Sequence, residues 1–69
     1  MPVLNTIELE GLSEKSWGEA AREALKEASK TIRNISKLEI LGTGTEVDGN
    51  RIARYRTQVR LYFQVEEQR

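Results

Sequence analysis

The feature that most constrains the fold is a strict alternation of side chains near the end of the chain. Every second residue from Ala53 to Val65 is apolar, aromatic or Thr, while the intervening positions carry Arg, Gln or Tyr. A period of two is typical of a β-strand with one buried and one solvated face. The run spans thirteen residues, more than twice the usual strand of about five or six. We therefore expect part of this strand to extend beyond its own fold.

The first part of the chain predicts a strand and then a helix. Val3–Glu10 alternates as well, and we expect Gly11 to end that strand. Ser16 and Glu19 have capping-box spacing, in which the Ser16 hydroxyl accepts from the Glu19 amide and the Glu19 carboxylate accepts from the Ser16 amide. Apolar residues at steps of three and four then predict a helix over 16–33. This stripe comprises Trp17, Ala20, Ala21, Ala24, Leu25, Ala28, Ile32 and Ile35. Since it is mostly Ala, the helix must approach its partner surface closely.

After Asn34 the pattern changes from helical to alternating and predicts a second strand. Gly42 and Gly44 indicate a bulge, a bend or the close approach of another backbone. Asp48-Gly49-Asn50 predicts a tight turn into the last strand. Residues 1–69 thus predict a single α+β domain in the order β-α-β-β, a three-stranded antiparallel sheet packed on one helix. The face away from the helix is expected to carry Glu8, Glu10, Lys37, Glu39, Arg54, Arg56 and Arg60.

Small size and missing residue types narrow the possible functions. A domain of 69 residues buries only about 60% of its unfolded surface. The chain has no Cys and no His, which excludes disulfides, thiolate or imidazole metal sites, and Cys or His catalysts. No carboxylate pair stands in a cleft-forming context, so an enzyme is the least expected class. Oligomerisation is the remaining support for so small a core, and we expect a homo-oligomer.

The charge balance and hydropathy argue against two classes of partner. The chain has eleven basic and eleven acidic residues, and this balance disfavours wholesale binding of nucleic acid or membrane. No apolar run approaches the roughly 20 residues of a membrane span. The N-terminus also lacks the basic start and apolar stretch of a signal peptide. A cytoplasmic location is therefore expected.

Two segments of the helix region resemble the dodecin family. They are S-W-x-E-A, here residues 16–20, and A-S-K-T-I-R-N-I, here residues 28–35. The resemblance extends over nearly the whole chain and implies a cytoplasmic homododecameric hollow shell of cubic symmetry. The best-known members bind flavins in pairs, stacked between aromatic side chains of neighbouring subunits, and are thought to store or buffer flavin.

The positions that contact flavin in the family are changed in this chain. The stacking Trp of the family corresponds to Lys37, and the Gln that binds the flavin edge corresponds to Arg56, which follows Tyr55. A basic residue often found seven positions after the Trp corresponds to Gly44. An ammonium cannot supply the stacking of an indole, worth about 0.5–1.5 kcal/mol beyond burial. The resemblance therefore implies a shell for binding or storing a small ligand, without typical flavin recognition. The cofactor stays open, because the Arg56 guanidinium could still stack on a flavin.

Three positions have two interpretations each. Lys37 and Arg56, if close together, could capture a small anion; alternatively they pair with Glu8, Glu10 or Glu39 in a cross-strand ladder. Trp17 packs the helix start onto the sheet or a neighbouring subunit, or it stacks on a ligand. In each case the structural interpretation is favoured.

Metal and nucleic acid are the remaining candidate partners. Some dodecin-like proteins without the flavin Trp are described as calcium-binding, and the acidic candidates here are Glu46, Asp48, Glu66 and Glu67. Calcium takes about six to eight oxygens, so such a site would have to be shared between subunits. Arg54, Arg56, Arg60 and Tyr62 form a basic, partly aromatic stripe of the kind that single strands follow. The zero net charge and the Glu residues on the same face make nucleic acid unlikely.

Overall fold

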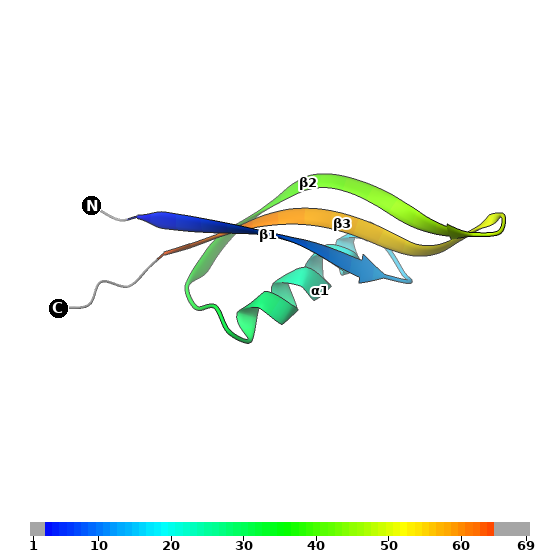
Figure 1. Cartoon of the computed structure of the whole chain (residues 1–69). Helices are drawn as coiled ribbons and strands as arrows, with labels where there is room; N and C mark the ends of the chain where they lie inside the picture. The colour runs from blue at the N-terminus through cyan, green and yellow to red at the C-terminus, as the bar shows by residue number, and fades with distance from the viewer. Residues whose placement is uncertain (1–2, 65–69) are drawn as a thin grey trace.

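The computed structural model describes residues 3–64 and contains three strands and one helix. In chain order they are β1 (Leu4–Ser13), α1 (Trp17–Ser29), β2 (Ile35–Asp48) and β3 (Arg51–Gln64). The sheet has the order β1-β3-β2, both junctions are antiparallel, and α1 covers one face (Figure 1). These observations confirm the α+β class and the β-α-β-β order. Within residues 3–64, no helix has the length and apolar character needed to cross a membrane.

The strongly alternating segment is the central strand. β3 pairs with β1 from Tyr55 to Gln64 in unbroken register, and it pairs with β2 along almost its whole length. β1 ends at Ser13, opposite Tyr55, so the β2-β3 hairpin continues alone to its turn at Gly49, where φ is +66° (Figure 1). Part of the long strand therefore projects beyond the helix-covered fold, as expected. Val65, the last residue of the predicted run, lies outside the described residues.

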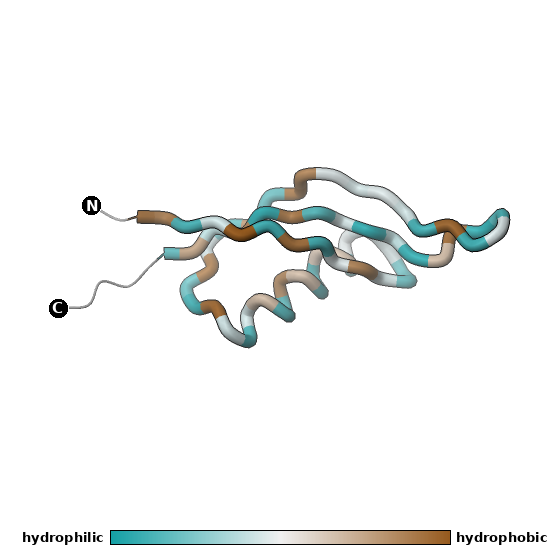
Figure 2. Tube along the Cα trace, in the orientation of Figure 1, coloured by the Kyte–Doolittle hydropathy of each residue, from teal (hydrophilic) through white to brown (hydrophobic). Residues whose placement is uncertain are grey.

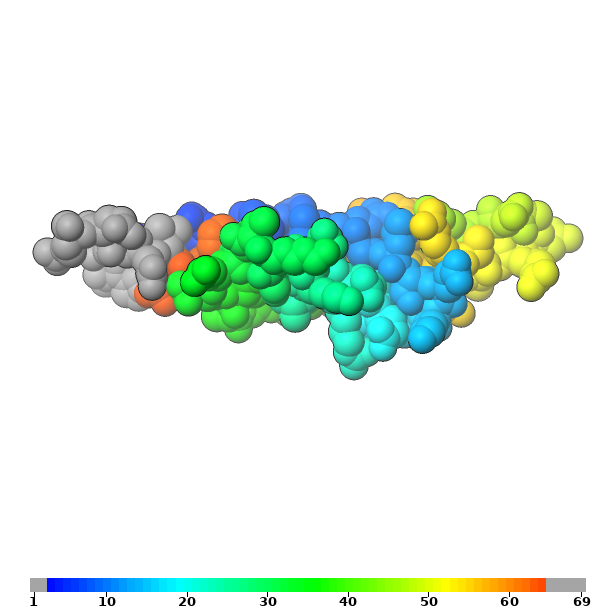
Figure 3. Space-filling view, turned by 90° about the horizontal axis from the view of Figure 1, so that it is seen from below, coloured from blue at the N-terminus to red at the C-terminus, as the bar shows by residue number. Residues whose placement is uncertain are grey.

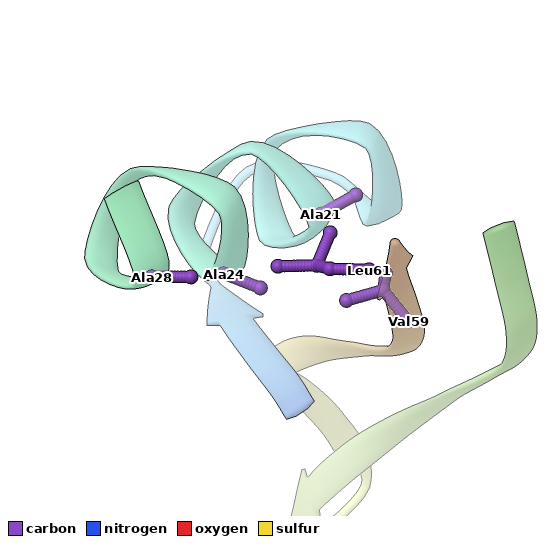
Figure 4. Packing of buried hydrophobic residues seen from close by; sticks show 5 residues of the cluster. All are labelled: Ala21, Ala24, Ala28, Val59 and Leu61. Atoms are coloured by element: carbon purple, nitrogen blue, oxygen red, sulfur yellow. The ribbon is translucent and has the colours of Figure 1, made fainter. Parts of the chain in front are cut away.

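The core is a thin layer of small helix residues on two larger residues of β3. Ala21, Ala24 and Ala28 point from α1 toward Val59 and Leu61, both fully buried (Figure 4). Because Ala has a short side chain, the helix backbone lies close to the sheet, as the Ala-rich stripe predicts. Partly buried residues complete the layer around it: Ile7, Leu9, Leu25, Ile32, Ile35 and Leu38.

The prediction that Gly11 ends the first strand is wrong, because β1 continues to Ser13. Gly11 instead marks the point where the helix backbone crosses the strand. A Cβ built there would lie 1.8 Å from the carbonyl oxygen of Ala20. At Gly42 and Gly44 the nearest atoms to such a Cβ belong to side chains and lie at 3.6 and 3.8 Å. Of the alternatives for that pair, the bulge is the one observed, as a register shift between Ile40 and Gly42.

The helix is shorter than predicted at its C-terminal end. It ends at Ser29 with Lys30 as the cap, not at Arg33. The Ala28 carbonyl accepts hydrogen bonds from the amides of both Thr31 and Ile32, at 3.1 and 2.9 Å. Asn34 then turns the chain with φ of 64°, a conformation that interrupts a right-handed helix. Ile35, placed in the helical stripe by the sequence pattern, opens β2 instead.

The isolated subunit is elongated and leaves much apolar surface uncovered. Its radius of gyration is 14.3 Å, against about 11 Å for a compact domain of this length. Its accessible surface is 5457 Å², against about 4400 Å² for a compact monomer of this mass. The large exposed hydrophobic residues include Val3, Leu4, Trp17, Ile40, Leu41, Val47 and Ile52. Figure 2 shows that hydrophobic residues occur along the open edges and near the end of the hairpin.

Candidate functional site

The face of the sheet opposite α1 collects most of the strand charges, and we call it the charged sheet face. Period two along β3 sends Val59 and Leu61 to the helix and the intervening residues to the other side. The strands on either side of β3 contribute the acids. The face comprises Glu8, Glu10, Lys37, Glu39, Glu46, Arg54, Arg56, Arg60 and Tyr62. Its four basic and four acidic side chains balance, so the face as a whole carries no net charge.

Arg56 is held by two hydrogen bonds to a single carboxylate. Its Nε donates to Glu10 Oε2 at 2.6 Å and its Nη2 donates to Glu10 Oε1 at 3.0 Å. This is the bidentate geometry that a planar guanidinium favours. The hydrogen bond from Arg56 holds the pKa of Glu10 below its ordinary value, and the same bond raises the pKa of Arg56. Of the two interpretations of Arg56, the structure shows the cross-strand ion pair.

Arg60 lies at the centre of a second group of polar contacts. Its Nη2 donates to Glu8 Oε2 at 2.9 Å, and its Nη1 lies 3.8 Å from Glu39 Oε1. The Tyr62 hydroxyl donates to the same Glu39 oxygen at 2.7 Å. The hydrogen bond with Glu8 and, next, the one with Tyr62 raise the pKa of Arg60. The guanidinium is thus engaged from both neighbouring strands.

Lys37 lies far from Arg56, so the prediction that these two cations are neighbours is wrong. Lys37 is opposite Tyr62 in the β2-β3 register, and its ammonium lies over the Tyr62 ring, 4.4 Å from the centroid. Arg56 is six residues further along β3, about 20 Å away at the rise of a strand. Its partner on β2 is Gly44. Of the three positions predicted to correspond to the family's flavin contacts, a single chain therefore brings Gly44 and Arg56 together, and Lys37 stands apart.

Trp17 attaches the start of the helix to the sheet. Its Nε1 donates to the Gly44 carbonyl at 2.9 Å, and its ring meets Tyr55 edge-on, with centroids 4.9 Å apart. Thr57 Oγ1 donates to the Trp17 carbonyl at 2.8 Å. Trp17 is still 43% exposed. Thr57 had no predicted role, although a polar residue at a buried position of the alternating strand is the signal for one.

The helix cap has one of the two bonds that the capping box predicts. The Ser16 hydroxyl accepts from the Glu19 amide at 3.0 Å. The Glu19 carboxylate instead accepts from Arg22, one turn further along the exposed side of the helix, at 3.1 Å. A single N-cap bond satisfies one of the otherwise unpaired amides of the first turn.

Glu46 and the Arg residues of the basic stripe already form ion pairs within the sheet. Glu46 accepts from Arg54 Nε at 2.7 Å, and Asp48 is exposed next to the hairpin turn. Within residues 3–64 no group of three possible metal ligands comes together; Glu66 and Glu67 lie outside that range. All three Arg residues of the basic stripe are paired with carboxylates, and Lys37 covers the Tyr62 ring. The stripe therefore presents ion pairs and no continuous cationic path.

Comparisons with known proteins find the same family and fold. The family model described as Dodecin matches residues 3–66. Dodecin from Streptomyces coelicolor is similar over 97% of this chain and 96% of its own, with 24% identity and a TM-score of 0.93. A variant of dodecin from Thermus thermophilus is similar over 99% of this chain and 100% of its own, with 26% identity and a TM-score of 0.93. No curated protein sequence matches the chain.

Proposed function

The chain belongs to the dodecin family, and from this membership we propose that it forms a cytoplasmic, hollow homododecamer that binds or stores a small ligand without typical flavin recognition. It has no catalytic role in this proposal. The observation that carries the ligand part is the bidentate pairing of Arg56 with Glu10. The proposal specifies no ligand, because the altered side chains remove the expected flavin contacts and do not define a new set of ligand contacts.

Assembly is supported by the mismatch between the buried and the exposed apolar side chains. Within residues 3–64, the fully or nearly buried hydrophobic residues are four Ala together with Val59 and Leu61. Larger side chains stay in water, among them Ile40 at 57% and Ile52 at 55% exposure. Burying them against other copies would supply about 1.5–3 kcal/mol for each fully covered side chain. A shell of identical subunits is thus a physical solution for so thin a core.

Reduced flavin recognition is supported by what the altered side chains do. Lys37 offers no aromatic surface, and its ammonium lies on the Tyr62 ring. The hydrogen bonds that Arg56 could give to a ring edge are directed at Glu10. Withdrawing Arg56 would leave the Glu10 carboxylate without its partner. A flavin would therefore compete with an existing ion pair and find no stacking partner at position 37.

The test combines mass in solution with flavin titration. Light scattering is expected to give about 95 kDa, twelve times the 7.9 kDa of one chain. The purified protein is expected to be colourless and to quench riboflavin fluorescence weakly. The double variant Lys37→Trp/Arg56→Gln is expected to bind riboflavin at least about 2–13-fold more tightly, the factor given by 0.5–1.5 kcal/mol of stacking.

The control variant is Lys37→Trp/Arg54→Gln, which changes the same residue types but removes a neighbouring Arg. It is expected to gain only the stacking contribution. A yellow wild-type protein, or wild-type affinity equal to that of Lys37→Trp/Arg56→Gln, would overturn the ligand part and restore typical flavin binding. A monomeric mass would overturn the shell.

A further inference from the structure

The end of the β2-β3 hairpin carries two aliphatic side chains that its own chain leaves uncovered. We define the hairpin tip as residues 47–52. Val47 and Ile52 lie opposite each other across the two strands and are 65% and 55% exposed. β1 ends before this point, and the tip projects beyond the helix in the space-filling view (Figure 3). An unsupported two-stranded ribbon is marginally stable in water, so this tip needs a surface to pack on.

A groove of matching character lies between β1 and α1. It has a volume of about 280 Å³, the space of roughly nine waters, and it can take two aliphatic side chains. Its apolar lining comes from Leu9, Gly11 and Leu12 of β1 and from Ala24 of α1. Three acidic residues also line it: Glu10, Glu23 and Glu27. β1 is an edge strand, so one side of its backbone is open along this groove.

One pair of opposite charges could join the two surfaces, although Asp48 lies opposite Arg51 at the same turn. Arg51 stands at the turn of the hairpin, and Glu23 stands at the groove. Neither has an ion pair within residues 3–64, whereas Glu27 is paired with Lys30 at 3.3 Å. Opposite charges at the edge of an apolar contact direct the partner and fix its orientation.

We propose that the hairpin tip of one chain docks into the β1–α1 groove of a second copy, with Val47 and Ile52 on the apolar lining and Arg51 beside Glu23. This inference rests on the proposed self-assembly and specifies one of its contacts. The tip cannot fill its own groove, because the antiparallel ladder holds the hairpin extended away from β1 (Figure 1). Tip to groove is a heterologous contact, which closes into rings when the rotation permits. A shell of cubic symmetry requires such rings beside its two-fold contacts.

The absence of Cys from the sequence permits an unambiguous cross-linking test. Ile52→Cys and Leu12→Cys chains with different tags are co-expressed and treated with a short bismaleimide. The proposal predicts cross-linked dimers containing one chain of each kind, and none when either variant is expressed alone. The control pairs Ile52→Cys with Lys26→Cys, an exposed helix position outside the groove lining, and is expected to stay uncross-linked.

Charge exchange provides a second, independent readout. Arg51→Glu and Glu23→Lys are each expected to make the assembly dissociate at several-fold higher protein concentration than the wild type. The double variant is expected to recover most of that loss. Cross-linking of Ile52→Cys alone would overturn the proposal in favour of tip-to-tip contact. An assembled wild type without mixed cross-links would overturn the docking contact but not the proposed homododecamer. A monomeric wild type would overturn both the docking contact and the homododecamer.

Discussion

A single methyl group added at Gly11 should strongly destabilise the fold, and Gly11→Ala tests the helix–sheet packing directly. The added Cβ would lie 1.8 Å from the Ala20 oxygen, 2.8 Å from the Ala20 carbonyl carbon and 3.2 Å from the Ala24 Cβ. The two nearest atoms belong to the backbone and cannot rotate aside. Real contacts of this kind do not fall below 3.0 Å, so the helix must move from β1 by at least about 1.2 Å.

The cost of that movement is large for a domain of this size. Overpacking a well-packed site costs about 1–3 kcal/mol, and the shift also opens the contacts of Ala20 and Ala24, which are 0% and 5% exposed. We expect a loss of about 3 kcal/mol or more. The total stability of 69 residues is on the order of 3–10 kcal/mol, so Gly11→Ala should unfold at much lower denaturant or fail to accumulate.

Gly18→Ala provides the matched control, because it adds the same methyl group to the first turn of α1. The nearest atoms there, at 3.8 and 3.9 Å, belong to the side chains of Arg22 and Ser16. Ala is favoured over Gly in helices by up to about 1 kcal/mol, so this variant is expected to be slightly stabilised. Urea unfolding is followed by circular dichroism at fixed protein concentration, since assembly makes stability depend on concentration. Equal midpoints for Gly11→Ala and the wild type would refute the packing argument.

Substitutions at three further positions test other contacts. Thr57→Val keeps the side-chain shape but removes the hydrogen bond to the Trp17 carbonyl, and it should cost about 1 kcal/mol and shift Trp17 fluorescence; an unchanged spectrum and midpoint would contradict this. Because Arg56 lowers the pKa of Glu10 from 4.5, the Glu10 carboxylate stabilises the fold above that value, and this contribution is lost as pH falls through the lower folded pKa. Glu10→Gln should therefore flatten the acid side of the pH–stability curve below about pH 4.5; an unchanged slope would count against the pair. Asn34 has φ of 64°, so Asn34→Ala should cost about 1 kcal/mol of stability, whereas Asn34→Gly should not. Equal melting temperatures for the two variants would contradict this.

Features with a local cause were predictable from the sequence. The period of two along β3 follows from strand geometry alone, so the buried role of Val59 and Leu61 could be predicted without any partner. The first turn of the helix depends on Ser16, a neighbour in sequence. The crossing of Gly11 by the helix backbone was missed because it depends on two segments that meet only in the folded chain.

The separation of Lys37 from Arg56 was also predictable, because the two residues lie at different distances in sequence from the hairpin turn. Gly49-Asn50 fixes the hairpin register, with Asp48 opposite Arg51. Counting eleven residues away from the turn on each strand reaches Lys37 and Tyr62, the pair that the structure shows, because the register shifts at Glu46/Val47 and Ile40/Gly42 cancel. No turn joins β1 to β3, however, so the choice of Glu8 for Arg60 could not be read from sequence spacing.

Two of the positions predicted to correspond to flavin contacts in the family lie next to each other in this chain. Gly44 lies opposite Arg56, and a Cβ at Gly44 would lie 3.8 Å from Arg56 Nη1. A basic side chain at position 44 would therefore place a second cation beside the guanidinium. With Gly there, the Arg56 guanidinium pairs with Glu10 and meets no side chain at position 44. Restoring a basic residue at 44 in the presence of Arg56 would add repulsion, so reversion toward the family pattern must begin with Arg56→Gln.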